Sequence, residues 1–417
     1  MGLWFAQYES RAMANVKLVI NDVVYPGKGL ARMEDGCVVF VSGVLPGETV
    51  EVEITKQKKN FAEARLIEVI KPSQFRMPPK CKLADICPGC RYQHAEYGEE
   101  LRLKQAQFIN LLERQAKVDA TGFCLPPIPS PVSLEYRNKI VLHAAVADDA
   151  GSLGYFGEDN DTVIDVASCP LAMRPLNDLL ADLRARQDFM AALKPDMRVT
   201  LRYTKTDGAV HWCGKPKADD SWLRESTSIG SIKVPRGGFF QMNPAMADEL
   251  VKHVLDLINT IKPERVIDLY CGVGVFAMAA GLAGIGKVFG IDSDKEAVLA
   301  AKSNAQDRGL EGVQFIAAAA EKGLKYMLGS GTPGKTTLIV DPPRMGLEKC
   351  VVELINSAKP SDVVYVSCAP DTLARDIALL KAGEYRVVSS LLLDMFPRTP
   401  YFESVTHLKS ARNLTAG

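Results

Sequence analysis

One cysteine stands where a reactive thiol would be useful. The apolar run at 363–366 ends in Ser367 and Cys368, and a segment with the pattern of a helix follows. In open parallel sheets, ligands bind outside the carboxyl ends of the strands, so this thiol is expected at a ligand site. A helix that begins nearby would favour the thiolate, the nucleophilic form of cysteine. Cys368 is therefore a candidate nucleophile, with Asp371 and Thr372 as candidate caps of the following helix.

A second group of cysteines has the spacing of a metal site. Cys81, Cys87 and Cys90 are separated by five and two residues, and a Pro-Gly turn lies between the last two. Cys169, beside another proline, is a candidate fourth ligand. Thiolates bind soft metals, so the set predicts a structural zinc or an iron–sulfur cluster. The alternative is that these are separate buried cysteines, because Cys is common in protein cores.

A third feature is a glycine turn between an apolar strand and a helix-like segment. The stretch VIDLYCGVGVF contains Gly272 and Gly274, which let the backbone approach a ligand closely and adopt conformations that a side chain forbids. The next strand-like segment ends at Asp292, at the offset where a carboxylate of a nucleotide-binding fold meets ribose hydroxyls. A further apolar stretch, LIVDPPR, places Asp341 at the end of a strand.

A parallel sheet would bring these segments together. From about residue 238 onward, strand-like and helix-like segments alternate, which predicts such a sheet with helical crossovers. Residues 14–72 contain short strands with Pro-Gly turns, the pattern of a small OB-like barrel, a fold that often binds oligonucleotides. Residues 73–235 are mixed, with helices expected at 99–118 and 175–193 and strands near 139–147, 153–157 and 162–166. We therefore predict three domains, at 14–72, 73–235 and 236–417, with the helix at 99–118 able to pack on the last.

Composition and charge restrict the class of protein. A chain of 417 residues with 47% hydrophobic and 24% charged residues is typical of a globular protein with two or three domains. The net charge is zero, but residues 52–82 carry eight Lys or Arg against three Glu, a basic segment that could meet nucleic acid or simply face solvent. No apolar run is long enough to span a bilayer, and the N-terminus lacks a secretory signal. We expect a cytoplasmic protein, with Met1 or Met13 as its start.

The motifs together resemble those of the RNA uracil-C5 methyltransferases, which use S-adenosylmethionine to make 5-methyluridine in ribosomal or transfer RNA. FFQMNP, DLYCGVG, DPPR, SCAP and TPYFESV occur in the family's order. The resemblance covers nearly the whole chain and implies an α/β fold: a class I (Rossmann-like) methyltransferase domain, an N-terminal TRAM barrel and a small α+β central domain. The cysteine spacing is similar to that of the branch with a 4Fe–4S cluster, which favours iron over zinc and 23S rRNA over tRNA.

The resemblance also implies a role for each site residue. Cys368 would add to carbon 6 of uracil, which makes carbon 5 nucleophilic toward the methyl group. Glu403 would then remove the carbon-5 proton, and Asp341 would face both the cofactor and uracil N3–H. The cofactor would also be contacted by Gln241, Tyr270, Gly272, Gly274 and Asp292, and the cluster would be held by Cys81, Cys87, Cys90 and Cys169.

Two segments of the central region resemble family segments near the RNA path. They are 136–139 (YRNK) and 154–156 (GYF), whose basic groups could meet phosphates and whose aromatic rings could stack on unpaired bases. Packing on a strand surface is the alternative for both. Because carbon 6 is reached only when the target uridine leaves its stack, the expected partner is a looped RNA. The sequence indicates no obligate protein partner, and it does not identify the target uridine.

Some positions depart from the family pattern. Val275 and Ala369 stand where many relatives have Asn, and an alanine run occupies 317–320, where an acidic or amide group often contacts adenine. Glu321 follows that run and could substitute for the missing group. These departures weaken single cofactor contacts rather than the assignment of the class.

Three other interpretations predict different residues or behaviour. An exocyclic-amine methyltransferase usually has an aromatic residue where Arg344 stands, and it has no use for Cys368. A non-catalytic RNA-binding protein with a decayed methyltransferase fold would have lost Cys368 or Glu403, and both are present. A redox sensor would use the cysteine cluster to change RNA affinity with oxygen, without methyl transfer.

Overall fold

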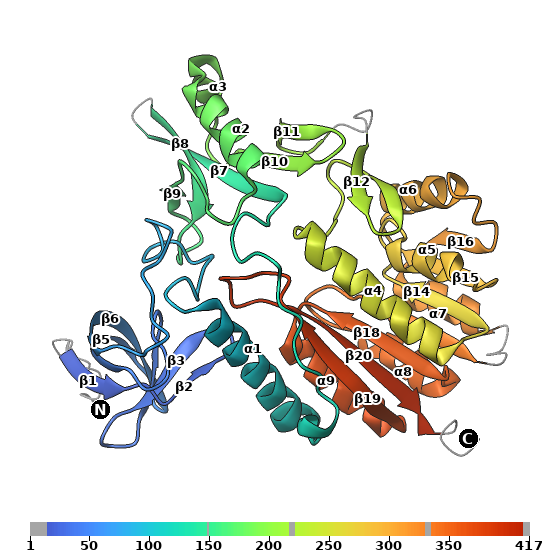
Figure 1. Ribbon diagram of the computed structural model, residues 1–417, viewed down its shortest axis with the longest axis horizontal. Coiled ribbons are helices and arrows are strands. Elements are labelled where there is room, and N and C mark those ends of the chain that lie inside the picture. Colours follow the sequence, from blue (N-terminus) through green and yellow to red (C-terminus); the bar gives the residue numbers. More distant parts are fainter. Residues whose placement is uncertain (1–14, 148–149, 217–221, 330–334, 412–417) are drawn as a thin grey trace, which may run out of the picture. The chain divides into compact units, whose positions relative to one another are not determined.

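The computed structural model describes residues 15–147, 150–216, 222–329 and 335–411 (Figure 1). The chain divides into two compact units. The first comprises the residues up to Gln107 together with Arg398–Pro400, and the second comprises Phe108–Pro397 and the residues from Tyr401 onward. Each unit is described by itself below. No helix of the described residues combines the length and the apolar character needed to cross a membrane.

The first unit is built on a six-stranded sheet in the order β1-β5-β6-β4-β3-β2, drawn in blue in Figure 1. Buried and half-buried residues alternate along the first part of β5, which places Val50 and Val52 in a small apolar core. Neighbouring strands are antiparallel except β4 and β6. The expected strand-rich N-terminal fold is confirmed, with β1 Asn15–Val19, β2 Asp22–Val24, β3 Lys28–Arg32, β4 Val38–Val41, β5 Thr49–Gln57 and β6 Phe61–Lys71.

Helix α1 follows the sheet and crosses from the first unit into the second. It spans Tyr97–Leu111 and continues as a π-helical turn over Leu112–Ala116, against the prediction of 99–118. Lys117 ends this turn in a left-handed backbone conformation, with φ 52°. The π-helical turn packs on α9 of the second unit, where Lys381 Nζ donates to the carbonyl of Lys117 at 2.8 Å. These contacts lie within the second unit, to which the residues from Phe108 onward belong.

The second unit begins with a five-stranded antiparallel sheet in the order β11-β10-β7-β8-β9. Helix α2 packs its leucines against this sheet. The predicted helix at 175–193 is two helices, because Arg186 adopts an extended conformation between them. A hairpin, β12–β13, follows. The elements are β7 Lys139–Ala147, β8 Ala150–Phe156, β9 Val163–Asp165, α2 Arg174–Ala185, α3 Gln187–Ala191, β10 Arg198–Thr204, β11 Gly208–Cys213, β12 Leu223–Thr227 and β13 Gly230–Val234.

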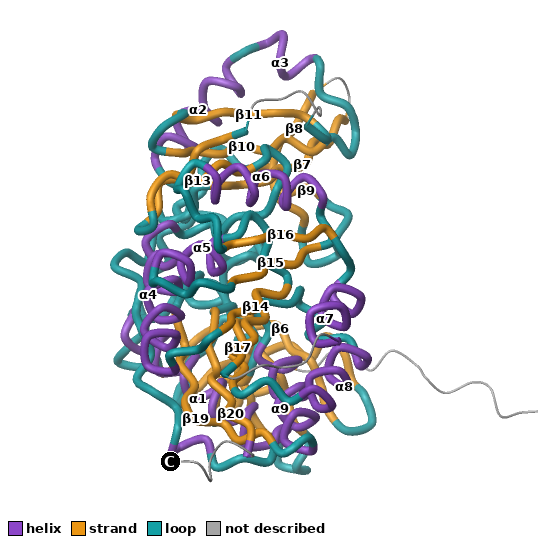
Figure 2. The backbone as a smooth tube through the Cα atoms, turned by 90° about the vertical axis from the view of Figure 1, so that its right-hand side faces the viewer, coloured by secondary structure: helices purple, strands orange, loops and turns teal. Residues whose placement is uncertain are grey.

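The candidate site is carried by a seven-stranded sheet in the order β16-β15-β14-β17-β18-β20-β19. Figure 2 shows α4 and α5 on one side of this sheet and α7, α8 and α9 on the other. Because both faces are covered, every residue of β14, β17 and β18 is buried. The strands are β14 Arg265–Leu269, β15 Val288–Asp292, β16 Val313–Ala317, β17 Thr336–Val340, β18 Asp362–Ser367, β19 Tyr385–Leu393 and β20 Glu403–Ser410. The helices are α4 Pro244–Ile261, α5 Val275–Leu282, α6 Lys295–Gln306, α7 Ala320–Gly329, α8 Lys349–Ala358 and α9 Pro370–Ala382.

The order of the strands predicts where a ligand would bind. The chain builds outward from β14 to β15 and β16 on one side, and then returns to place β17 and β18 on the other side. This reversal lies between β14 and β17, and ligands bind outside the carboxyl ends of the strands at such a point. Strands β14, β15, β16, β17 and β18 are parallel, whereas β20 is antiparallel to its neighbours. The beginning of β20 therefore lies at the same edge as the ends of the parallel strands.

Candidate active site

Cys368 and Glu403 are brought together by the pairing of β18 with β20. Ser367, the last residue of β18, pairs with Ser404 of β20, so Cys368 and Glu403 are the next residues along the two strands. The Ser404 hydroxyl donates to the Ser367 carbonyl at 3.2 Å. Glu403 is 3% exposed, whereas Cys368 is partly accessible. The register of the sheet thus places a thiol beside a buried carboxyl group.

The turn after Cys368 is fixed by serine and threonine hydroxyls. The Ser367 hydroxyl accepts a hydrogen bond from the backbone N–H of Ala369 at 3.1 Å. Ala369 is the N-cap of α9 and contributes no side-chain cap, so the prediction that Asp371 and Thr372 cap this helix is wrong. The Thr372 hydroxyl instead lies 3.0 Å from the Ala369 carbonyl and 3.1 Å from the Arg344 carbonyl. It thereby connects the turn after Cys368 to the segment after β17.

Burial and the neighbouring carboxyl groups disfavour the thiolate of Cys368. Burial raises the pKa of Cys368 to about 12, and the neighbouring carboxyl groups of Glu403 and Asp341 add to this effect. The Arg344 guanidinium acts in the opposite direction. The sequence predicts that the start of α9 favours the thiolate, whereas burial, the largest influence here, raises the pKa of the Cys368 thiol. Activation needs a proton acceptor or a change of charge when ligands bind.

The two carboxyl groups beside the thiol both have raised pKa values. Burial raises the pKa of Asp341 to about 7, with a further contribution from Asp292. Burial also raises the pKa of Glu403 well above its usual range, and Asp341 adds to this while Arg344 opposes it. Among the described residues, Glu403 Oε2 has no hydrogen-bond partner. Carboxyl groups with raised pKa values suit proton transfer.

The glycine turn begins at the end of β14. Tyr270 has a positive φ of 68°, and Gly272 and Gly274 have φ values of 52° and 85°. A Cβ atom at Gly274 would lie 2.6 Å from the ring of Phe315, so only glycine fits there. Gly272 donates its backbone N–H to Asp292 Oδ2 at 2.8 Å. The glycine turn is therefore hydrogen-bonded directly to the Asp292 carboxylate at the end of β15.

Asp268 explains how α5 is oriented at this turn. Its Oδ2 accepts the backbone N–H of Ala277 at 2.9 Å, within the first turn of α5. Burial raises the pKa of Asp268 well above the usual range, and the carboxyl groups of Asp341 and Asp292 add to this. Asp268, Asp292 and Asp341 thus lie near one another at the carboxyl ends of β14, β15 and β17. Sequence analysis did not assign a role to Asp268, although it lies in the DLYCGVG motif.

Asp376 holds the segment that carries Asp341 and Arg344 through a hydrogen bond to its backbone. This carboxylate on α9 is fully buried and accepts the Tyr365 hydroxyl at 2.7 Å and the backbone N–H of Leu347 at 2.7 Å. Arg375 donates to Asp376 Oδ1 at 2.8 Å. Asp376 therefore connects β18, α9 and the segment after β17. Sequence analysis missed this residue; its spacing from Cys368 within SCAPDTLARD was the available signal.

Gln241 lies in the loop between β13 and α4. This loop is anchored by Asn243, whose side chain caps α4 and donates to the Met395 carbonyl at 3.2 Å. Gln241 is half-buried, whereas Phe239 is 72% exposed. The backbone N–H of Asn138 donates to the Met242 carbonyl at 2.9 Å, which connects the loop to β7.

The four candidate metal ligands are divided between the units. Cys81, Cys87 and Cys90 lie in an irregular loop of the first unit, and Cys169 belongs to the second. Gln93 accepts the backbone N–H of Cys81 at 3.0 Å and donates to Cys90 Sγ at 3.2 Å. Such N–H donors to sulfur suit thiolate ligands. Across the described ranges, no three or more His, Cys, Asp or Glu residues are arranged to hold a metal ion.

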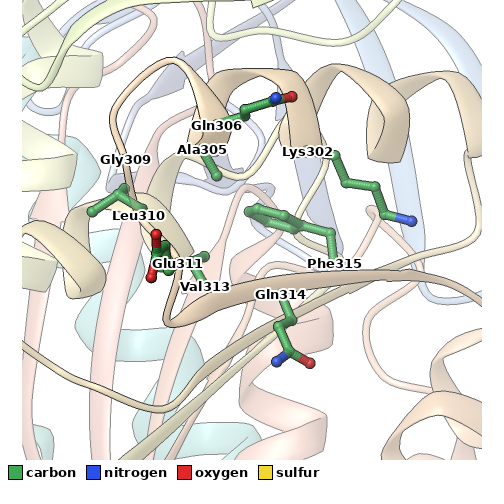
Figure 3. Close-up of a pocket in the computed structure, with 9 residues that line it drawn as sticks. All are labelled: Lys302, Ala305, Gln306, Gly309, Leu310, Glu311, Val313, Gln314 and Phe315. Atoms are coloured by element: carbon green, nitrogen blue, oxygen red, sulfur yellow. The ribbon is translucent and has the colours of Figure 1, made fainter.

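A surface pocket lies away from these residues (Figure 3). It is lined by the end of α6 and the beginning of β16, including Lys302, Leu310 and Phe315. The parallel strands begin at this edge of the sheet, whereas the candidate site lies where they end. The pocket is therefore separate from the candidate site.

The C-terminal part and the N-terminal part of the chain are each similar to a known protein family or domain. The family described as tRNA (Uracil-5-)-methyltransferase matches residues 220–411, and the TRAM domain matches residues 16–67. An RNA methyltransferase of Halalkalibacterium halodurans is 30% identical over 447 residues, which cover 94% of this chain and 96% of the relative. The 23S rRNA (uracil(1939)-C(5))-methyltransferase RlmD of Shewanella sediminis is 28% identical over 425 residues. The match covers 94% of this chain and 95% of that relative.

One solved structure has a closely similar fold. The tRNA (uracil-54, C5)-methyltransferase of Pyrococcus abyssi, in complex with S-adenosyl-L-homocysteine, superposes with a TM-score of 0.72 at 23% identity. The match covers 94% of this chain and 100% of that one. The expected α/β methyltransferase fold is confirmed by this likeness, and the N-terminal TRAM fold by the domain match.

Proposed function

The chain belongs to the RNA uracil-C5 methyltransferase family, and on that premise we propose that it methylates carbon 5 of a uridine in RNA. S-Adenosylmethionine supplies the methyl group. The observation that carries the proposal is the placement of the Cys368 thiol beside the buried carboxyl group of Glu403 and the half-buried one of Asp341. A thiol next to a proton acceptor is what addition to carbon 6 and removal of the carbon-5 proton require.

The reaction divides between Cys368, which follows the end of β18, and Glu403, which begins β20. The Cys368 thiolate forms a bond to carbon 6, and the ring electrons move to give an enolate that attacks the methyl carbon through carbon 5. Glu403 then takes the proton from carbon 5, and the carbon 6–sulfur bond breaks to restore the aromatic ring and the thiolate. The products are 5-methyluridine, S-adenosylhomocysteine and one proton.

Asp341 and Arg344 are proposed to prepare the site for these steps. The carboxyl group of Asp341, with its pKa near 7, is suited to orient the uracil ring through N3–H. The Arg344 guanidinium favours the thiolate of Cys368 and lies 4.2 Å from the centre of the Tyr401 ring. Stacking on this ring restricts the guanidinium. Arg344 therefore offsets part of the effect of the two carboxyl groups on the thiol.

The cofactor is proposed to lie across the carboxyl ends of β14, β15 and β17. Gly272 and Gly274 allow its close approach, and Tyr270 and Gln241 are proposed further contacts. Each oxygen of Asp292 already accepts one backbone N–H, from Gly272 and Asp294, both at 2.8 Å. A carboxylate oxygen can accept a second hydrogen bond, so Asp292 remains able to bind ribose hydroxyls.

We propose 23S rRNA as the substrate, with tRNA as the alternative. The full-length match to the RlmD relative supports ribosomal RNA, whereas the solved structure with the similar fold acts on tRNA. The TRAM fold supports RNA as the partner in either case. Methylation of deproteinised 23S rRNA and of total tRNA by the same preparation would decide between them.

We also propose that Cys81, Cys87, Cys90 and Cys169 hold a 4Fe–4S cluster, with zinc as the alternative. The proposal is supported by the cysteine spacing and by the N–H donor of Gln93 to the sulfur of Cys90. Iron, acid-labile sulfide and zinc would be measured in anaerobically purified protein, with Cys90→Ser as the control. Zinc in place of iron, or neither, would reject the cluster.

A covalent trap tests the activity itself. Fluorine at carbon 5 cannot leave as a proton, so 5-fluorouridine-substituted RNA should hold the enzyme as an adduct that survives denaturation. The adduct should form with S-adenosylmethionine in the wild type and be absent in Cys368→Ala. An equal band in the variant would contradict the role of Cys368, and no band on ribosomal or transfer RNA would contradict the activity.

A further inference from the structure

The segment after β17 makes a turn that presents an apolar side chain to solvent. In this turn the Gly346 N–H donates to the Pro343 carbonyl at 2.8 Å, and Arg344 and Met345 are the two central residues. Met345 is 78% exposed, more than any other large hydrophobic residue in the part of the chain that the structure describes. Single exposed apolar residues are common on protein surfaces, so the role of Met345 must be argued from its surroundings.

The backbone of this turn is fixed on α9. Arg375 Nη2 donates to the Met345 carbonyl at 2.9 Å, and the Asp376 carboxylate accepts the Leu347 N–H at 2.7 Å. Gly346 has a φ of 74°, and a Cβ atom there would lie 2.6 Å from both Arg375 Nη2 and Asp376 Oδ2. Glycine is therefore needed where the turn meets the helix. The backbone of Met345 is held firmly, although its side chain is exposed.

The same turn adjoins the proposed nucleophile. The Thr372 hydroxyl lies 3.1 Å from the Arg344 carbonyl, which belongs to the same peptide group as the Met345 N–H, and 3.0 Å from the Ala369 carbonyl. Ala369 follows Cys368 directly in the chain. One hydroxyl group thus connects the turn of Met345 to the turn of the thiol, and all of these residues belong to the second unit. Met345 therefore lies at the edge of the proposed active site.

The charge next to Met345 suits RNA as the molecule that covers it. Arg344, the preceding residue, is also exposed, so a cation and a flexible apolar side chain are neighbours in this turn. A nucleotide offers a negative phosphate and a base with apolar faces, and proteins that bind unpaired RNA use cations for the first and side-chain stacking for the second. The turn carries both kinds of group.

Reaction at Cys368 creates a need for such an apolar group. A stacked uridine exposes carbon 6 only after it leaves its stack, and its departure removes the stacking partner of the adjacent base. Proteins that unstack nucleic acids insert apolar side chains, methionine among them, between the bases. The unbranched, polarizable side chain of methionine adapts to irregular gaps and packs well on aromatic rings.

We propose that Met345 packs against the base next to the target uridine, in the gap that opens when this uridine turns out of its stack toward Cys368. The inference rests on the proposed function and adds an RNA contact to it. The contact stabilises the unstacked RNA and takes no part in the bonds that Cys368 and Glu403 make and break. Its loss should therefore matter only when the adjacent base is present.

A double-mutant cycle between protein and RNA tests the proposal with the full-length chain. The substrates are the RNA whose target uridine the 5-fluorouridine trap maps, and two copies with an abasic nucleotide on the 5′ or the 3′ side of that uridine. Met345→Ala should lower kcat/KM on the intact RNA about tenfold, the usual effect of losing one stacking contact to a base. On one of the abasic RNAs, Met345→Ala and the wild type should be equal.

Two further variants separate an apolar contact from a general defect. Met345→Leu keeps an apolar side chain of similar size and should retain most of the activity. Leu299→Ala, at a 58% exposed position of α6, is the matched control and should equal the wild type on every RNA. Because Met345 and Leu299 are exposed, all three variants should unfold at the urea concentration of the wild type.

Fluorescence of the trapped complex gives a readout that does not depend on the rate. 2-Aminopurine replaces the base adjacent to the 5-fluorouridine, and acrylamide should quench it faster in the adduct of Met345→Ala than in that of the wild type. Unchanged kcat/KM of Met345→Ala on the intact RNA, a loss that persists on both abasic RNAs, or equal quenching would each overturn the inference. A wild type that forms no adduct rejects the proposed function and the inference with it, whereas an active wild type with an unaffected Met345→Ala rejects the inference alone.

Discussion

Cys368 and Glu403 occupy facing positions at the end of one antiparallel strand pair. Their neighbours Ser367 and Ser404 are partners in the register of β18 and β20 and are joined by a hydrogen bond of 3.2 Å. The distance between the proposed nucleophile and the proposed base is therefore set by the sheet rather than by a mobile loop. Sites built on strands hold their geometry more closely than sites built on loops.

Replacing Glu403 separates the two halves of the proposed reaction. Glu403→Gln keeps the size of the side chain but cannot accept the carbon-5 proton. We expect turnover to fall by about 10²-fold or more, while a methylated protein–RNA adduct accumulates on ordinary uridine RNA. Denaturing gels with radiolabelled S-adenosylmethionine measure both effects. Unlabelled or absent adduct would contradict the role of Glu403 in the second half of the reaction.

The raised pKa of Cys368 gives a pH dependence of definite sign. With a pKa near 12, the thiol is protonated at neutral pH, so the thiolate fraction increases about tenfold for each pH unit. The rate of adduct formation with 5-fluorouridine RNA should therefore rise between pH 6.5 and pH 8.5, roughly in that proportion. A flat or falling rate over this range would show that the thiolate is already formed in the complex.

Substitution of Arg344 should shift the pH dependence of adduct formation. Its guanidinium favours the thiolate of Cys368, so Arg344→Gln raises the pKa further and lowers the adduct rate at a given pH. Because Arg344 is exposed, we expect a modest decrease of roughly three- to tenfold. Arg344→Lys, which keeps the charge, should recover part of the rate. An equal decrease in both variants would mean that the planar guanidinium on Tyr401, and not the charge, is required.

The sequence was most informative where each motif ends a strand. The reactive cysteine, the glycine turn and the carboxylates at 292 and 341 all follow apolar runs, and parallel pairing brings the ends of such runs together. The position of Glu403 could be assigned only from the family resemblance. Its place beside Cys368 depends on the antiparallel strand β20, which is inserted between β18 and β19 and has no local sequence signal.

Electrostatics and long-range contacts could not be predicted from local patterns. The helix start after Cys368 suggested a thiolate, yet burial and two carboxyl groups from distant strands raise the pKa of the thiol. Asp376 accepts hydrogen bonds from the Tyr365 hydroxyl and from the backbone of Leu347, which lies in a different segment of the chain. These pairs are products of the three-dimensional fold, and their residues are ordinary polar groups when read along the chain.

Asp376 should support activity without touching the reacting atoms. Asp376→Asn weakens the hydrogen bonds from the Tyr365 hydroxyl and the Leu347 N–H inside the core, and we expect a loss of stability of about 2–3 kcal/mol. Tyr365→Phe removes one of these bonds and should cost about 1 kcal/mol. Urea denaturation measures both. The Asn variant should also lose more activity than the Phe variant, and the reverse order would contradict the support of the Arg344 segment by Asp376.

Alanine substitutions of Gly272 and Gly274, the two glycines of the turn, form a matched pair of variants. A Cβ atom at Gly274 would lie 2.6 Å from the Phe315 ring, whereas a Cβ atom at Gly272 would meet nothing within 4 Å. Both residues have a positive φ, so each alanine substitution carries a strain of about 1 kcal/mol. Gly274→Ala adds a steric clash and should destabilise the protein by a further 1–3 kcal/mol or so. Calorimetry should show weaker S-adenosylmethionine binding in both variants, since both change the backbone that meets the ligand. Normal stability of Gly274→Ala would mean that the turn can move away from Phe315, and that the glycine there serves the ligand alone.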